Sequence, residues 1–112
     1  MLYNAGRPRG ITLRSAEQPW GPWSDGAVVF EPWRVQGYGH LLHIVARFKD
    51  RRDALSDPGR EDEWRGEYGP YVMARFTAGS AGACRIYHTM STWNPYQVVA
   101  MRSDLKLKAA AK

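Results

Sequence analysis

The fold is decided by the stretch from Tyr71 to Arg102, which reads YVMARFTAGSAGACRIYHTMSTWNPYQVVAMR. Three segments rich in β-branched and aromatic residues are separated by short turns, which is typical of strands: 71–76, 85–91 and 96–102. Three successive antiparallel strands form a meander. Because Val98-Val99-Ala100-Met101 is apolar at every position, we expect both faces of this sheet to be covered.

The rest of the chain has the same β character. We expect strands at 11–16 and 27–30, the end of a strand at 1–4, and a further strand at 41–48, followed by a long polar run at 49–67. Eleven Gly and seven Pro interrupt these segments at short intervals, and helical periodicity is nearly absent. The sequence therefore predicts an all-β chain. Leu2 and Tyr3 would need a strand partner upstream, which suggests a truncated sheet.

Composition narrows the classes of partner. Sixteen Lys and Arg against eleven Asp and Glu give a net charge of +5, but the basic residues are scattered and match no nucleic-acid-binding signature. We therefore expect no nucleic acid partner and, without a long apolar segment or a visible signal peptide, no membrane partner. Five Trp and six Tyr are many for so short a chain and suggest stacking surfaces. The single Cys84 is expected to be a small buried residue.

Several segments resemble one known family. Tyr68-Gly69-Pro70-Tyr71 and the run MSTWNPYQVV at 90–99 resemble the family catalogued as domain of unknown function 4185, as do the run from Arg14 to Ser24 and the stretch from Leu55 to Trp64. The resemblance implies a five-bladed β-propeller related to glycoside hydrolases, whose members include enzymes that cut arabinose-containing polysaccharides. It also implies relatives that are extracellular or located in the cell envelope.

On this resemblance, the chain is a partial β-propeller of about one and a half blades, made of antiparallel meander sheets and a long irregular loop. Residues 1–104 form the propeller part: 1–34 are outer strands of one blade, 35–67 are the irregular connection and 68–104 are the last blade. Residues 105–112 form a flexible basic tail. The chain would be the C-terminal fragment of a longer protein.

Glycoside hydrolysis generally needs two carboxylates across the scissile bond. Most Asp and Glu crowd between 50 and 67, and a solvated polar loop explains that cluster best. Glu67 is the one candidate catalyst, because it directly precedes Tyr68 at the expected start of a strand. We expect no complete catalytic pair in this chain.

A sugar-binding rim is the more concrete expectation. In an antiparallel pair the start of one strand lies beside the end of the next. The rim would therefore contain rings for stacking and side chains that hydrogen-bond sugar hydroxyls: Tyr68, Tyr71, Arg75, Ser91, Trp93 and Asn94. Alternatively, Trp93-Asn94-Pro95-Tyr96 is only a well-capped turn.

His43 is the sole candidate for a cation ligand; the three histidines form no metal motif, and we expect no cofactor. The first functional hypothesis is a carbohydrate-active propeller fragment that binds polysaccharide and is not catalytic alone. The alternative is a non-enzymatic β module that self-associates through open sheet edges. An active small hydrolase is a third, which turnover abolished by Glu67→Gln would support.

Overall fold

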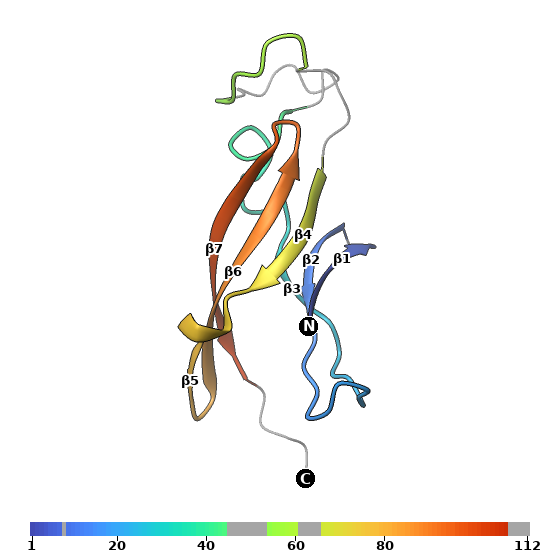
Figure 1. Ribbon diagram of the computed structural model, residues 1–112, viewed down its shortest axis with the longest axis vertical. Helices are drawn as coiled ribbons and strands as arrows, with labels where there is room; N and C mark the ends of the chain where they lie inside the picture. Colours follow the sequence, from blue (N-terminus) through green and yellow to red (C-terminus); the bar gives the residue numbers. More distant parts are fainter. Residues whose placement is uncertain (8, 45–53, 61–65, 108–112) are drawn as a thin grey trace.

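The computed structural model describes residues 1–7, 9–44, 54–60 and 66–107. They form an elongated molecule of 53 × 27 × 23 Å built from two antiparallel sheets (Figure 1). The sheets are not closed into a barrel, and among the described residues the only helix is a short 3-10 turn at Ala74–Phe76. The predicted all-β class is thereby confirmed, and the sheets are consistent with part of a propeller-like meander.

The first sheet is a three-stranded meander. Its strands are β1 (Leu2–Gly6), β2 (Arg9–Leu13) and β3 (Ala27–Phe30), in the order β1-β2-β3. Leu2 lies opposite Leu13 in β2, so β1 has a strand partner within the hairpin. The register between β2 and β3 shifts between Ile11 and Thr12, which marks a bulge.

The second sheet is built around one long strand, β6 (Ala83–Trp93). On one side β6 pairs with β7 (Gln97–Lys106), and on the other with β4 (Gly66–Val72) and β5 (Ala78–Ser80). The 3-10 turn separates β4 from β5, so these two short strands share one edge of β6.

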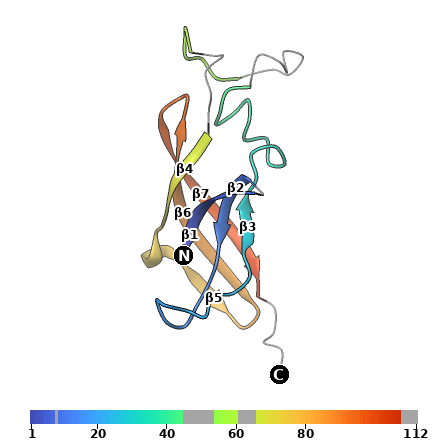
Figure 2. The same ribbon diagram turned by 90° about the vertical axis from the view of Figure 1, so that its right-hand side faces the viewer.

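The two sheets pack face to face (Figure 2). Burial alternates along β6, and the even-numbered side chains from Ile86 to Thr92 are buried, as a half-covered strand requires. Met90 meets Ile11 and Phe30 of the first sheet, and these three form the core cluster. We call the side of the second sheet that faces this core its inner face.

The opposite side, which we call the outer face, is open. Val98 is 70% exposed, and Ala100 is exposed beside it, while Val99 and Met101 pack against the core. The expectation that both faces are covered is therefore wrong. The all-apolar run reflects small residues that are tolerated on the open face, and only its odd-numbered side chains face the core.

Element boundaries differ from expectation at several places, and the strand expected at 11–16 spans Arg9–Leu13. The strand expected at 71–76 begins at Gly66 and ends at Val72, and the turn expected at 77–83 contains β5. β7 continues to Lys106, so the expected tail at 105–112 begins as a strand; 108–112 lie outside the described residues. Of the strand expected at 41–48, residues 41–44 form no strand apart from one bridge between Tyr38 and Leu42, and 45–48 lie outside the described residues.

Candidate functional site

The outer face brings together several of the residues expected to bind sugar. Tyr68 lies opposite Ser91 and Tyr71 lies opposite Thr89, so their side chains share one face of the sheet. Tyr71 is 68% exposed and Tyr68 is also exposed. A bulge between Tyr68 and Tyr71 places both tyrosines on the outer face although three positions separate them.

Aromatic rings continue this surface at the β6–β7 turn. Trp93 follows Ser91 on the same face of β6, and its ring meets that of Tyr96 edge-on, with centroids 6.4 Å apart and planes at 62°. The guanidinium of Arg60 lies 5.5 Å from the Tyr96 ring centroid. Tyr96 is exposed. We call Tyr68, Tyr71, Ser91, Trp93 and Tyr96 the aromatic platform.

Asn94 does not belong to this platform. Its side chain is fully buried, and its Nδ2 donates to the carbonyl of Arg60. Its backbone has a φ of 61°, a left-handed conformation that Asn tolerates well. The backbone carbonyl of Asn94 also accepts a bond of 3.4 Å from the amide of His43. The expected sugar contact by Asn94 is corrected to the alternative, a structural turn residue.

Arg75 lies apart from the rim to which it was assigned. It is exposed in the 3-10 turn, with its guanidinium 4.9 Å from the centroid of the Phe76 ring. Phe76 in turn meets Tyr87 edge-on at 6.5 Å. Tyr87 is the next residue on the same face of β6 after Thr89, in the direction away from Trp93. Arg75 therefore lies beside the end of the outer face that is opposite to Trp93.

Glu67, the candidate catalyst, faces the other way. Its side chain is only 2% exposed, and its Oε1 lies 3.6 Å from Nε of Arg9 in the first sheet. The backbone carbonyl of Glu67 also accepts a hydrogen bond of 2.5 Å from Nδ2 of Asn4. These contacts join β4 to the first sheet, so the geometry gives Glu67 a structural role and no access to a ligand on the outer face.

Of the other carboxylates in the expected acidic cluster, the structure describes only some. Asp57 lies within a described segment, whereas Asp50, Asp53, Glu61, Asp62 and Glu63 lie outside the described residues.

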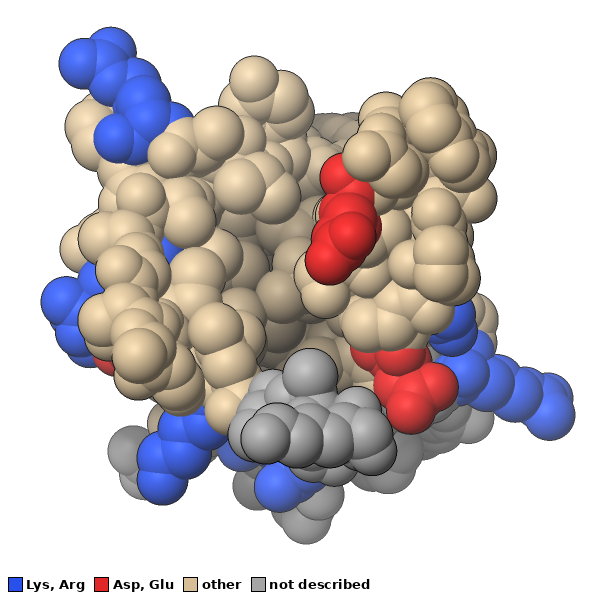
Figure 3. Space-filling model, turned by 90° about the horizontal axis from the view of Figure 1, so that it is seen from below, with Lys and Arg blue, Asp and Glu red and all other residues tan. Residues whose placement is uncertain are grey.

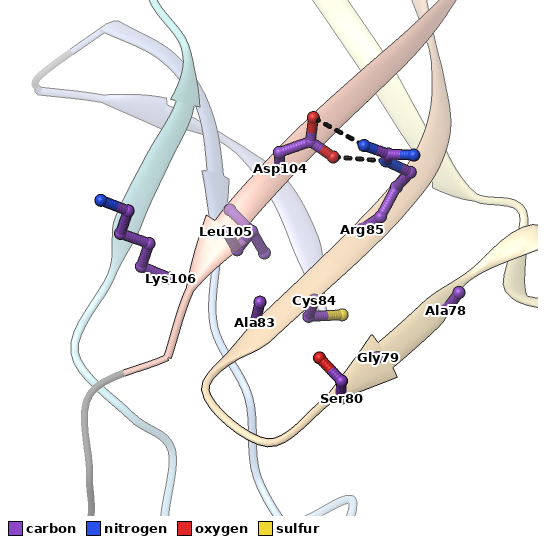
Figure 4. Close-up of a pocket in the computed structure, with 9 residues that line it drawn as sticks. All are labelled: Ala78, Gly79, Ser80, Ala83, Cys84, Arg85, Asp104, Leu105 and Lys106. Carbon is purple, nitrogen blue, oxygen red and sulfur yellow. Dashed lines mark hydrogen bonds and ion pairs between the residues drawn. The ribbon is translucent and has the colours of Figure 1, made fainter.

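A second charged group lies at the β5 end of the second sheet. There Asp104 accepts two hydrogen bonds from Arg85, of 2.5 Å to Nε and 3.2 Å to Nη2, beside an open hollow of about 550 Å³ (Figure 4). The donated bonds hold the pKa of Asp104 below its ordinary value and raise the pKa of Arg85. Nε of Arg102 on the same strand lies 3.5 Å from Oδ2 of Asp104, so Asp104 is held between two guanidinium groups. This is the chemistry of a surface ion-pair network and not of a catalytic acid.

An apolar cleft lies where the sheets diverge. It has a volume of about 520 Å³, and apolar side chains from both sheets and the intervening loops make up most of its lining, among them Met1, Leu13, Trp23, Val72, Ile86, Leu105 and Leu107. Figure 3, which looks at this end of the molecule, shows a hollow bordered mostly by uncharged side chains, with an acidic side chain at its rim. The two sheets are therefore in contact around Met90 and are separated by the cleft at this end.

The histidines show no metal-binding arrangement. His43 is buried, and its backbone is tied to Asn94, while His40 is exposed. In the described ranges no group of three or more His, Cys, Asp or Glu is arranged to hold a metal ion. His43 thus belongs to no such group in this part of the chain.

His88 couples the stability of the fold to pH. It is buried on the inner face, and its Nε2 lies 3.1 Å from Oγ of Ser103. Burial lowers the pKa of His88 below its ordinary value of 6.5, so below that pH the unfolded chain binds more protons than the folded one. The free energy of unfolding should therefore fall as the pH drops from 7 toward 5. In His88→Gln, urea denaturation at both pH values should show a smaller drop; an equal drop would contradict this assignment.

Sequence reasoning missed part of the outer face. The half-buried Tyr87 and the exposed Tyr96 and Val98 were not expected on it, and Phe76 was placed in a strand. The missing signal was parity, because Tyr87 has the same strand parity as Ser91 and Trp93 and must share their face.

Comparison with protein-family models, with curated proteins and with solved structures gave no match. The resemblance described above therefore stands on its motif residues alone. Within the described segments, no helix has the length and apolarity needed to cross a membrane.

Proposed function

We propose that the aromatic platform binds a polysaccharide or oligosaccharide, and that the chain is the C-terminal, binding part of a carbohydrate-active propeller protein. The observation that carries this proposal is the exposure of Tyr68 and Tyr71 on an open sheet face, continued by Trp93 and Tyr96. Exposed rings gathered on one face need a physical reason, because monomeric proteins rarely leave a contiguous apolar surface of this kind without a partner.

The chemistry of the platform suits a sugar. A pyranose or furanose ring has an apolar C–H face that stacks on an aromatic ring, while its hydroxyls both donate and accept hydrogen bonds. Tyr hydroxyls and the hydroxyls of Ser91 and Thr89 offer both functions between the rings. The platform carries no carboxylate in its defining set, which suits a neutral glycan.

The position of Glu67 supports binding without hydrolysis by this residue. A glycosidase needs an acid within reach of the glycosidic oxygen. The Glu67 carboxylate is buried against Arg9, between the sheets, whereas Tyr68 points to the outer face. The side chain nearest in sequence to the platform therefore supplies no acid to a sugar bound there.

Tyr71→Ala should weaken polysaccharide binding by about tenfold, the contribution of one well-placed stacking ring. Isothermal titration calorimetry with soluble arabinan, and with a β-glucan as a second probe, would measure the change. Trp20→Ala is the matched control, because Trp20 is 80% exposed and lies in the loop after β2, outside the platform. Equal effects of the two substitutions, or no binding of any glycan by the folded wild-type protein, would contradict the proposal.

A second candidate function is a non-enzymatic module that self-associates through its sheet edges. The observation in its favour is β7, a ten-residue strand that pairs only with β6 among the described strands. Edge strands of this length are templates for pairing with another chain.

A further inference from the structure

We infer that the edge of β7 away from β6, which pairs with no other described strand, pairs with β7 of a second copy of this chain, antiparallel and with Ser103 opposite Ser103. This inference is independent of sugar binding. It specifies one edge, one partner and one register, each of which follows from the pattern of side chains along β7.

The backbone of β7 has its unpaired groups on alternate residues. The amide of Leu107 donates to the carbonyl of Gly82 at 2.9 Å, continuing the register in which Lys106 lies opposite Ala83. In an antiparallel pair, bonded and non-bonded residue pairs alternate. The odd-numbered residues of β7 therefore bond to β6, and the N–H and C=O groups of Ala100, Arg102, Asp104 and Lys106 point to the free edge.

Charge on the outer face selects the register. With Ser103 opposite Ser103, Arg102 lies opposite the second copy's Asp104, and Asp104 lies opposite the second copy's Arg102. A slip of one two-residue step in one direction puts Arg102 opposite Arg102, and the same slip in the other direction puts Asp104 opposite Asp104. Opposite charges across a strand pair stabilise it and like charges destabilise it, so the neighbouring registers are disfavoured.

The inner face is complementary in the same register. Met101 lies opposite the second copy's Leu105, and Val99 opposite its Leu107. Leu107 is 53% exposed, and Leu105 lines the apolar cleft between the sheets. Pairing would therefore cover apolar surface that the isolated chain leaves open.

The arrangement has a two-fold axis perpendicular to the sheet, as every antiparallel strand pair has. The two second sheets would join into one continuous sheet with both outer faces on the same side. Such an isologous contact closes on itself and gives a dimer and not a fibre. If the aromatic platform binds a glycan, the dimer presents two platforms side by side and binds a long polymer more tightly than a monomer does.

Charge reversal tests the register. Arg102→Asp places Asp opposite Asp, and Asp104→Arg places Arg opposite Arg, so each variant alone should dissociate about tenfold more readily than the wild type. An equimolar mixture of the two variants restores opposite charges at both positions of the dimer, so its heterodimer should dissociate less readily than the homodimer of either variant, although Asp104→Arg also removes the partner of Arg85. Sedimentation equilibrium of the wild type, of each variant and of the mixture measures all three.

Ala100→Pro tests the edge without touching the charges. The Ala100 amide points away from β6, so proline removes a donor of the dimer and leaves the β6–β7 bonds intact. Ala100→Thr is the control that retains the amide, and circular dichroism confirms folding of each variant. The inference predicts a monomer for the proline variant and a dimer for the control. A monomeric wild type at high micromolar concentration, or a dimer unaffected by the charge variants and by proline, would overturn it.

Discussion

Gly10→Ala is expected to lower the free energy of unfolding by about 3 kcal/mol or more, enough to remove much of the stability of a small domain. Gly10 has a φ of +140°, a conformation that residues with a side chain rarely adopt. A Cβ added at Gly10 would lie 2.1 Å from the carbonyl oxygen of Phe30, well inside contact distance. The backbone of β2 or β3 would have to move, and the pairing beside the bulge would be lost.

Urea denaturation followed by circular dichroism would measure this loss. Gly6→Ala is the matched control, because a Cβ at Gly6 meets nothing within 4 Å and its φ is not positive. The control should change the free energy of unfolding by no more than about 0.5 kcal/mol. Similar values for Gly10→Ala and Gly6→Ala would show that β2 and β3 do not approach each other as described.

Phe30→Ala is expected to reduce the free energy of unfolding by about 3–5 kcal/mol. Among the described residues Phe30 is the largest fully buried side chain, and it contacts both sheets through Ile11 and Met90. In the described part of the chain only five apolar side chains are buried in the core. Few neighbouring side chains can therefore move to fill the cavity that Phe30→Ala would leave. Most of the cooperative stability of the two-sheet arrangement should be lost with this one ring.

Trp20→Ala provides the comparison for Phe30→Ala, since it removes a larger aromatic side chain that is almost entirely exposed. We expect it to change the midpoint of thermal unfolding very little. Differential scanning calorimetry of both variants would separate the two cases. A Phe30 variant as stable as the Trp20 variant would mean that the sheets are not held together by this core.

Much of the strand content could be predicted from local sequence. β3 occupies the predicted residues, and β6 and β7 extend the predicted segments at their ends. These strands consist of β-branched and aromatic residues bounded by Gly, Pro and Asn, so their signals lie within a few neighbouring positions. The antiparallel pairing of β6 and β7 follows from the short turn between them.

β4 could not be predicted in the same way. Gly69 and Pro70 indicate a turn, yet both lie inside the strand at its bulge. β4 is an edge strand, where a residue without an amide donor is tolerated. Whether a segment is at an edge depends on which strands pair elsewhere in the chain, and no local pattern contains that information.

Only part of the candidate site could be predicted, because the surroundings of some of its residues also come from segments distant in sequence. The antiparallel order of the strands was sufficient to bring Tyr68, Ser91 and Trp93 together at one rim. Asn94 was misplaced because its environment comes from Arg60 and His43, which are distant in sequence. Glu67 was misplaced because its partner, Arg9, belongs to the other sheet.

The most direct test of the account is hydroxyl-radical footprinting of the protein with and without an arabinan oligosaccharide. In the free protein we expect rapid oxidation of Tyr71 and slow oxidation of Met90, since Tyr71 is on the outer face and Met90 is buried between the sheets. The oligosaccharide should then protect Tyr68 and Tyr71 and leave Trp20 unchanged. Rapid oxidation of Met90 would contradict the two-sheet packing, and bound oligosaccharide without protection of Tyr68 and Tyr71 would contradict the aromatic platform as its site.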